Sequence, residues 1–111
     1  STGGRPYTSY TALLSQTGQA APVAIVLENT TGNTIVWTRT TTGMYRGTWG
    51  TALADLDKVF FAPALGNFKN QTVVINVFGA STASFQLSTQ ENGSLGDNEL
   101  IRTGIEIRIY P

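Results

Sequence analysis

The chain has 111 residues, which fits a single domain. Only 13% of the residues are charged, about half the usual fraction, and seven basic residues balance seven acidic ones. Since there is no basic run, the sequence argues against partners such as nucleic acid or a membrane surface. Histidine and cysteine are absent, which excludes disulfides, thiolate metal sites and histidine-based catalysis, so we expect no cofactor.

The first half of the chain, residues 7–49, predicts four strands. Residues 7–16 form the first, with Tyr10 and Leu14 on one face. A turn at residues 17–19 ends it. Abundant threonine suits half-exposed strands better than helices, whose exposed faces usually carry Glu and Lys.

Residues 23–29 and 33–39 are the next two runs of alternating side chains. A short loop joins them, and it contains Gly32 between Asn29 and Asn33. These residue types tolerate left-handed backbone angles or bond their own main chain. Two β-rich runs joined in this way predict a hairpin in which the two strands pair with each other.

The fourth strand, residues 44–49, follows a turn at residues 40–43. Tyr45 and Trp49 share one face of this strand, with Gly47 between them. A glycine in such a position leaves room for a neighbouring ring or marks a bulge.

The middle of the chain is less regular. Residues 50–58 have a weak helical pattern that is too short for a stable helix, so a single turn or an irregular crossover is expected. Residues 58–62 predict a buried strand that ends at Pro63. Residues 64–70 then predict a loop, with Phe68 packed back onto the body of the domain.

The last third predicts a second hairpin and a final strand. Residues 72–78 and 83–88 alternate clearly and are separated by a Gly-containing turn. Residues 89–98 predict a flexible polar loop. Residues 101–110 predict the final strand, whose one face carries Ile101, Thr103, Ile105, Ile107 and Ile109.

About eight short strands without a convincing helix indicate an all-β fold, an antiparallel β-sandwich or barrel. We expect one domain over residues 7–111, preceded by a flexible N-terminal segment at residues 1–6. The side chains expected to be largely buried are Leu27, Ile35, Trp37, Phe60, Val73, Ile75, Phe85, Ile105 and Ile107.

The acidic residues have no catalytic signature. Asp55 and Asp57 read as loop carboxylates. Glu28 and Glu106 read as exposed strand residues that pair with arginines, the candidates being Arg39, Arg102 and Arg108. The loop at residues 91–99 has enough oxygen ligands for calcium, but it lacks the EF-hand spacing, so a solvated turn is favoured and no metal site is assigned.

The aromatic residues leave two interpretations open. Flat rings stack on sugars, whereas a β-sandwich also needs large aromatic side chains in its core. Trp37 lies among apolar neighbours and is assigned to the core. Tyr45, Trp49 and Phe68 are the candidate ligand or interface residues.

The segment TALLSQTGQAAPVAIVLENTTGNTIVWTRTTTGMYRGTW and the ending IEIRIYP carry a resemblance. They resemble a group of small uncharacterised proteins from environmental phages, other viruses and aquatic bacteria. In that group a TALLTQTG…APVATVLENTLG…VW…G.Y.G segment and an IEIRVYP ending recur. The resemblance covers the first half of the chain and the last strand. It implies a viral or surface structural role, in a virion or outside the cell, and no activity.

Two functions from different classes are therefore hypotheses. The first is a non-catalytic structural or interaction domain, virion-associated and self-assembling as a trimer or dimer, or bound to another structural protein. The second is a carbohydrate-binding domain that binds a glycan through exposed aromatic side chains; an enzyme is not expected. Low charge leaves few Lys and Glu residues to block edge pairing. The candidate interface residues are Tyr45, Trp49, Phe61, Phe68 and Tyr110.

Overall fold

The structure is a computed structural model that describes residues 6–66 and 73–111, with the side chains of residues 63–66 and Val73 excepted. Residues 1–5 of the predicted N-terminal segment and the candidate residue Phe68 lie outside the described part. Within it, all regular structure is β-strand, as the sequence predicts. The strands are β1 (Thr8–Ser15), β2 (Val23–Asn29), β3 (Ile35–Thr41), β4 (Met44–Trp49), β5 (Val59–Gly66), β6 (Val73–Phe78), β7 (Ser84–Glu91), β8 (Ser94–Leu95) and β9 (Thr103–Ile109).

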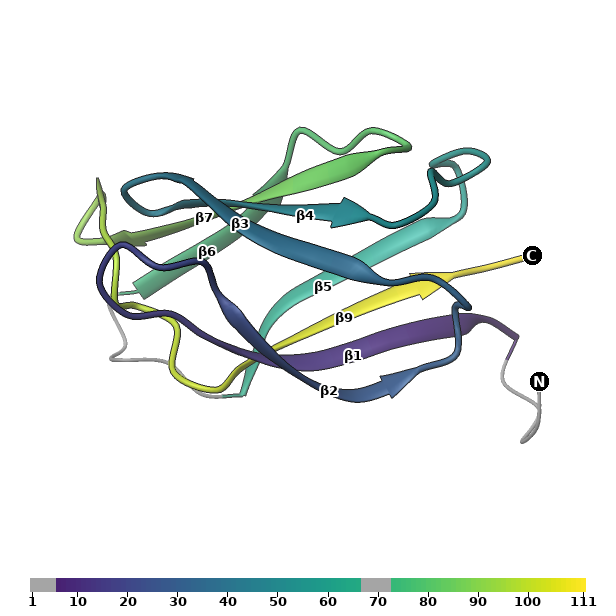
Figure 1. Ribbon diagram of the computed structural model, residues 1–111, viewed down its shortest axis with the longest axis horizontal. Coiled ribbons are helices and arrows are strands. Elements are labelled where there is room, and N and C mark those ends of the chain that lie inside the picture. Colours follow the sequence, from purple (N-terminus) through teal and green to yellow (C-terminus); the bar gives the residue numbers. More distant parts are fainter. Residues whose placement is uncertain (1–5, 67–72) are drawn as a thin grey trace.

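The strands form two antiparallel sheets packed face to face, which confirms the β-sandwich (Figure 1). The first sheet has the order β2-β1-β9-β5. The second has the order β3-β4-β7-β6, and the short β8 pairs with β7. Strands β2 and β5 are therefore the edges of the first sheet, and β3 and β6 are edges of the second.

The predicted hairpin of residues 23–29 and 33–39 is wrong. Strand β2 pairs with β1, and β3 pairs with β4, so the loop between β2 and β3 crosses from one sheet to the other. Side chains hold this loop in shape: the Asn29 amide donates to the Asn33 carbonyl at 2.6 Å and accepts from the Thr31 backbone N–H at 3.1 Å. The Thr30 N–H donates to the Ser9 carbonyl at 2.8 Å, which fixes the loop to β1.

The second predicted hairpin is confirmed. Strands β6 and β7 pair with Val77 opposite Leu87 and Phe78 opposite Gln86. The turn before β4 is also confirmed, with Gly43 at φ 69°, a backbone angle that favours glycine. Residues 50–58 contain no helix and form an irregular crossover, as expected.

Most strand boundaries differ from the prediction by one or two residues, and those of β5 and β7 differ by more. Strand β5 does not end at Pro63 but continues to Gly66, with a register shift between Pro63 and Leu65. A proline is tolerated there because β5 is an edge strand, whose one side needs no N–H donor. The predicted loop at residues 89–98 begins as strand, since β7 runs to Glu91 and turns tightly into β8.

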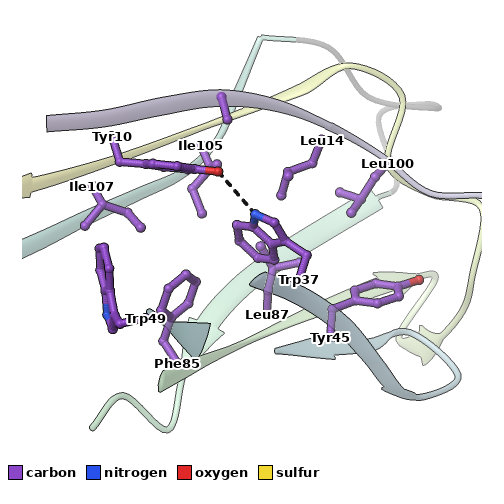
Figure 2. Close-up of a cluster of buried hydrophobic side chains, with 11 residues drawn as sticks. Tyr10, Leu14, Trp37, Tyr45, Trp49, Phe85, Leu87, Leu100, Ile105 and Ile107 are labelled. Carbon is purple, nitrogen blue, oxygen red and sulfur yellow. Dashed lines mark hydrogen bonds between the residues drawn. The ribbon is translucent and has the colours of Figure 1, made fainter. Parts of the chain in front are cut away.

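The core lies between the two sheets and is rich in aromatic rings (Figure 2). Phe85 is its centre: its ring lies 5.4 Å from Trp37, 6.1 Å from Trp49 and 5.1 Å from Phe61, measured between centroids. Gly47 makes this packing possible, because a Cβ at that position would collide with the Phe85 ring. The space for a neighbouring ring that the sequence predicts beside Gly47 is therefore present.

The predicted core is partly confirmed. Trp37, Phe85, Ile105 and Ile107 are buried, and Ile35 and Ile75 are half-buried against them. The side chain of Val73 lies outside the described part.

Leu27 and Phe60 were expected inside, and this prediction is wrong: they are 60% and 51% exposed. Leu27 lies on an edge strand beside a register shift, where β1 and β2 lose their regular pairing. Phe60 lies opposite Arg108, with the guanidinium carbon 5.9 Å from the ring centroid.

A helix long and apolar enough to cross a membrane is not found in the described residues.

Candidate functional site

Two of the three candidate ligand or interface residues belong to the core. The exposed fraction is 0% for Tyr45 and 4% for Trp49. Both side chains point from β4 toward the first sheet, and Figure 2 shows them among Leu87, Phe85 and Trp37. The expectation that they form an exposed aromatic surface is therefore wrong.

The position of β4 in the sheet explains their burial. This strand lies between β3 and β7, so side chains on its inward face are flanked by side chains of both neighbouring strands. Alternation places Tyr45, Gly47 and Trp49 together on that inward face. Trp37 on the neighbouring strand is also buried, as expected, and its indole N–H donates to the Tyr10 hydroxyl at 3.3 Å.

The Tyr45 hydroxyl reaches a polar cluster at one end of the sandwich. It donates to the Asp97 carboxylate at 2.7 Å. The same carboxylate accepts from the Arg39 guanidinium at 2.7 Å and from the Gly43 backbone N–H at 3.0 Å. Asp97 therefore ties the loop after β8 to the turn between β3 and β4.

The electrostatics of this cluster follow from its contacts. The hydrogen bond from Arg39 is the largest cause that lowers the pKa of Asp97, and burial opposes it. With the hydrogen bonds from the Gly43 N–H and the Tyr45 hydroxyl, the pKa falls to about 2. Burial, and then the bond to the Asp97 carboxylate, raise the pKa of the Tyr45 hydroxyl. Both residues therefore keep one protonation state through the neutral range, as a structural cluster does.

The geometry of residues 91–99 does not favour a calcium site. Both oxygens of Asp97 already accept hydrogen bonds from the protein. Among the described residues, no group of three or more acidic side chains is placed to hold a metal ion.

Three other carboxylates also have structural contacts. Glu106 pairs with Arg108 at 3.2 Å, which the sequence analysis proposed. Glu28 accepts a hydrogen bond from the Ser9 hydroxyl at 2.8 Å. The Asp55 carboxylate accepts from the backbone N–H of Asp57 at 3.1 Å, which closes a local turn.

Among the residues whose side chains the structure describes, β2 exposes more large apolar side chains than any other strand. The exposed fractions are 65% for Val23, 53% for Ile25, 50% for Val26 and 60% for Leu27. These four residues are called the β2 apolar edge below. A monomer usually spreads its exposed apolar side chains singly, so four on one strand make β2 a candidate interaction surface.

Both faces of β2 are exposed. Ile25 lies opposite Leu13, on the outer face of the first sheet. Val26 lies opposite Ala12, which is fully buried, so Val26 belongs to the inward face. Its 50% exposure means that the second sheet does not cover the edge of the first at this point.

The other described edges differ from β2. Strand β3 exposes one large apolar residue, Val36, among threonines. Strand β5 contains Pro63, which cannot donate to a new neighbour. Strand β6 exposes Val74 and Phe78, but it packs beside β5 of the opposite sheet.

Comparison with known proteins gives no further assignment: no protein-family model, curated protein or solved structure matches the chain.

The sequence analysis missed the β2 apolar edge, although the signal was present. Residues 23–27 read Val-Ala-Ile-Val-Leu, so apolar side chains occupy both alternating sets. A run of this kind is typical of a strand covered on both faces. In this fold the strand lies at a sheet edge, and apolar side chains remain exposed on both faces, although Ala24 packs against the core.

Proposed function

We propose that this protein is a non-catalytic structural or interaction domain that self-associates, and that the β2 apolar edge is the surface it uses. The observation that carries this proposal is the exposure of four apolar side chains within five residues of one edge strand, Val23, Ile25, Val26 and Leu27. An edge strand also offers a row of backbone N–H and C=O groups to a new neighbour.

The energetics favour a modest, reversible association. Full burial of one exposed Val, Leu or Ile side chain gains about 1.5–3 kcal/mol, and these side chains are already partly buried. Association costs roughly 4–15 kcal/mol in lost freedom of motion, so most of the gain from one strand is offset. The dissociation constant is therefore expected in the micromolar range.

The non-catalytic part of the proposal is supported by the inventory of side chains. The chain has no histidine or cysteine, and the Asp97 and Glu106 carboxylates are engaged with arginines. A domain built around threonine-rich strands and an apolar edge suits repeated assembly into a larger structure. Association with a virus particle, which the resemblance implies, is tested by the genes beside its coding sequence, where virion structural genes are expected.

The carbohydrate-binding alternative depended on Tyr45 and Trp49 as an exposed stacking surface. Because both rings are in the core, it has lost its structural basis. It is not proposed further.

Light scattering coupled to size-exclusion chromatography tests the proposal with two matched variants. Val26→Lys places a charge on the β2 apolar edge, and Val74→Lys places the same charge on β6, at a valine with the same 50% exposure. Lysine on an edge strand opposes pairing. At about 100 µM, the wild type and Val74→Lys should exceed the 11.9 kDa monomer mass, and Val26→Lys should not.

A wild type that remains at 11.9 kDa over the whole concentration range would overturn the proposal. Equal weakening by both lysine variants would show that the surface is not β2. The native circular dichroism spectrum of each variant confirms that it has folded.

A further inference from the structure

We infer that β2 pairs with β2 of a second copy, antiparallel and about a two-fold axis at Val26, so that two four-stranded sheets become one continuous sheet. This inference rests on the proposed function and adds its partner, orientation and register. Three observations carry it: the extent of the free edge, the position of the single charge on β2, and the exposure of both strand faces.

The free edge is limited to the strand itself. At the N-terminal end of β2, Pro22 precedes the strand, and proline has no N–H to donate to a new strand. At the other end the Thr30 N–H is bonded to the Ser9 carbonyl of its own β1 at 2.8 Å, and Asn29 and Thr31 form a local turn. A second strand can therefore overlap with residues 23–29 only.

Full overlap of this seven-residue strand with an antiparallel copy fixes the register. The midpoint, Val26, lies opposite the second Val26. Ile25 then comes to the level of Leu27, the residue that the register shift in β2 leaves without a partner on β1, and Glu28 comes to the level of Ala24. The apolar side chains of the two edges are then paired with each other over most of the strand.

Charge favours this orientation. Glu28 is the only charged residue of β2. In a parallel, in-register pair the two Glu28 carboxylates would lie side by side, and like charges placed opposite each other destabilise a sheet. In the antiparallel pair the two Glu28 residues lie at opposite ends of the paired strands, and each carboxylate is already held by the Ser9 hydroxyl of its own chain at 2.8 Å.

The partner is a second copy because the strand is complementary to itself. Two identical edges related by a two-fold axis satisfy each other and leave no further free surface of the same kind. The chain has a formal net charge of zero, so two copies do not repel at long range. The exposed apolar residues of β2 gain apolar neighbours: Val26 meets its equivalent, and Ile25 comes to the level of Leu27 of the other copy.

Disulfide cross-linking measures this register directly, because the chain has no cysteine of its own. Opposed residues in an antiparallel pair have Cα atoms roughly 4.5–5.5 Å apart, within the roughly 4.4–6.8 Å that a disulfide spans. On mild oxidation, Val26→Cys should therefore form a covalent dimer. Val74→Cys, a valine with equal exposure on β6, is the matched control.

A second pair of variants tests the same register. Ile25→Cys alone should cross-link poorly, since two copies of this position lie on a diagonal about 7–8 Å apart. A mixture of Ile25→Cys with Leu27→Cys should form the mixed dimer efficiently. We expect roughly tenfold more dimer from Val26→Cys and from this mixture than from Val74→Cys or Ile25→Cys alone.

The outcomes separate the inference from the proposed function. If the wild type associates but Val26→Cys cross-links no better than Val74→Cys, the two-fold β2 pairing is wrong and self-association stands. If the wild type is monomeric at every concentration, both are wrong. If β2 accepts only a strand from a different protein, Val26→Cys alone stays monomeric, which also overturns the inference.

Discussion

At the scale of single residues, Asp97 shows how this low-charge chain uses one of its few carboxylates. Its side chain is only 11% exposed and accepts hydrogen bonds from Arg39, Gly43 and Tyr45. A buried charge is tolerated when it is paired and hydrogen-bonded in this way. The contacts close one end of the sandwich, where the loop after β8 meets the turn between β3 and β4.

The Asp97 cluster predicts a loss of stability in acid. The pKa of Asp97 falls from 3.8 to about 2 on folding, so the folded state favours the ionised form. The contribution is complete above pH 4 or so and disappears as the pH falls toward about 2; it is on the order of 1–2 kcal/mol. Urea denaturation at several pH values should show this fall for the wild type.

The control for this prediction is Asp97→Asn, which should be less stable at neutral pH and should lose most of the decline between pH 4 and 2. Asp57→Asn, an exposed loop carboxylate, should behave like the wild type. An unchanged acid profile in Asp97→Asn would contradict the assigned role.

Residue patterns predicted which side chains share a face, but not which face is covered. The grouping of Tyr45, Gly47 and Trp49 was correct, as was the space beside Gly47. Whether that face looked inward depended on the position of β4 in its sheet, which is set by pairing with β7 some forty residues later. A local pattern cannot contain that information.

At the scale of elements, β9 and β2 differ in how far their apolar side chains are buried. Strand β9 lies between β1 and β5, and its Ile105 and Ile107 are buried. Strand β2 has one neighbour only, and its apolar residues remain exposed. Similar apolar sequences therefore have different roles because of their place in the sheet.

This contrast predicts unequal costs of truncation. Ile105→Ala or Ile107→Ala should lower the free energy of unfolding by roughly 2–5 kcal/mol, because each leaves a cavity in the core. Leu27→Ala should cost less than about 0.5 kcal/mol in dilute monomer, as expected for an exposed position. Denaturant titration at low micromolar concentration measures all three, and comparable losses at Leu27 and Ile105 would show that β2 is covered.

Strand pairing was predictable only where the chain reverses within one sheet. The β6–β7 hairpin satisfied this condition and was predicted correctly. The loop between β2 and β3 has the same kind of turn residues, yet it crosses between sheets and the predicted pairing is wrong. Asn29 and Gly32 specify a tight reversal, and they do so equally well for either connection.

At the scale of the whole molecule, the sandwich is more closed on one side than on the other. Strands β5 and β6 pack beside each other where the two sheets meet. On the opposite side lie the edges β2 and β3, and the inward-facing Val26 of β2 is 50% exposed. A second copy paired along β2 would cover this open side, which is why we place the interaction surface there.

Amide hydrogen exchange at two protein concentrations tests this account most directly. The rates in β2 are compared at low micromolar and at about 200 µM, on either side of the expected dissociation constant. We expect protection to rise with concentration in residues 23–29 and to stay unchanged in β6. Exchange in β2 that is independent of concentration, or protection that appears at β6 instead, would contradict self-association through the β2 apolar edge.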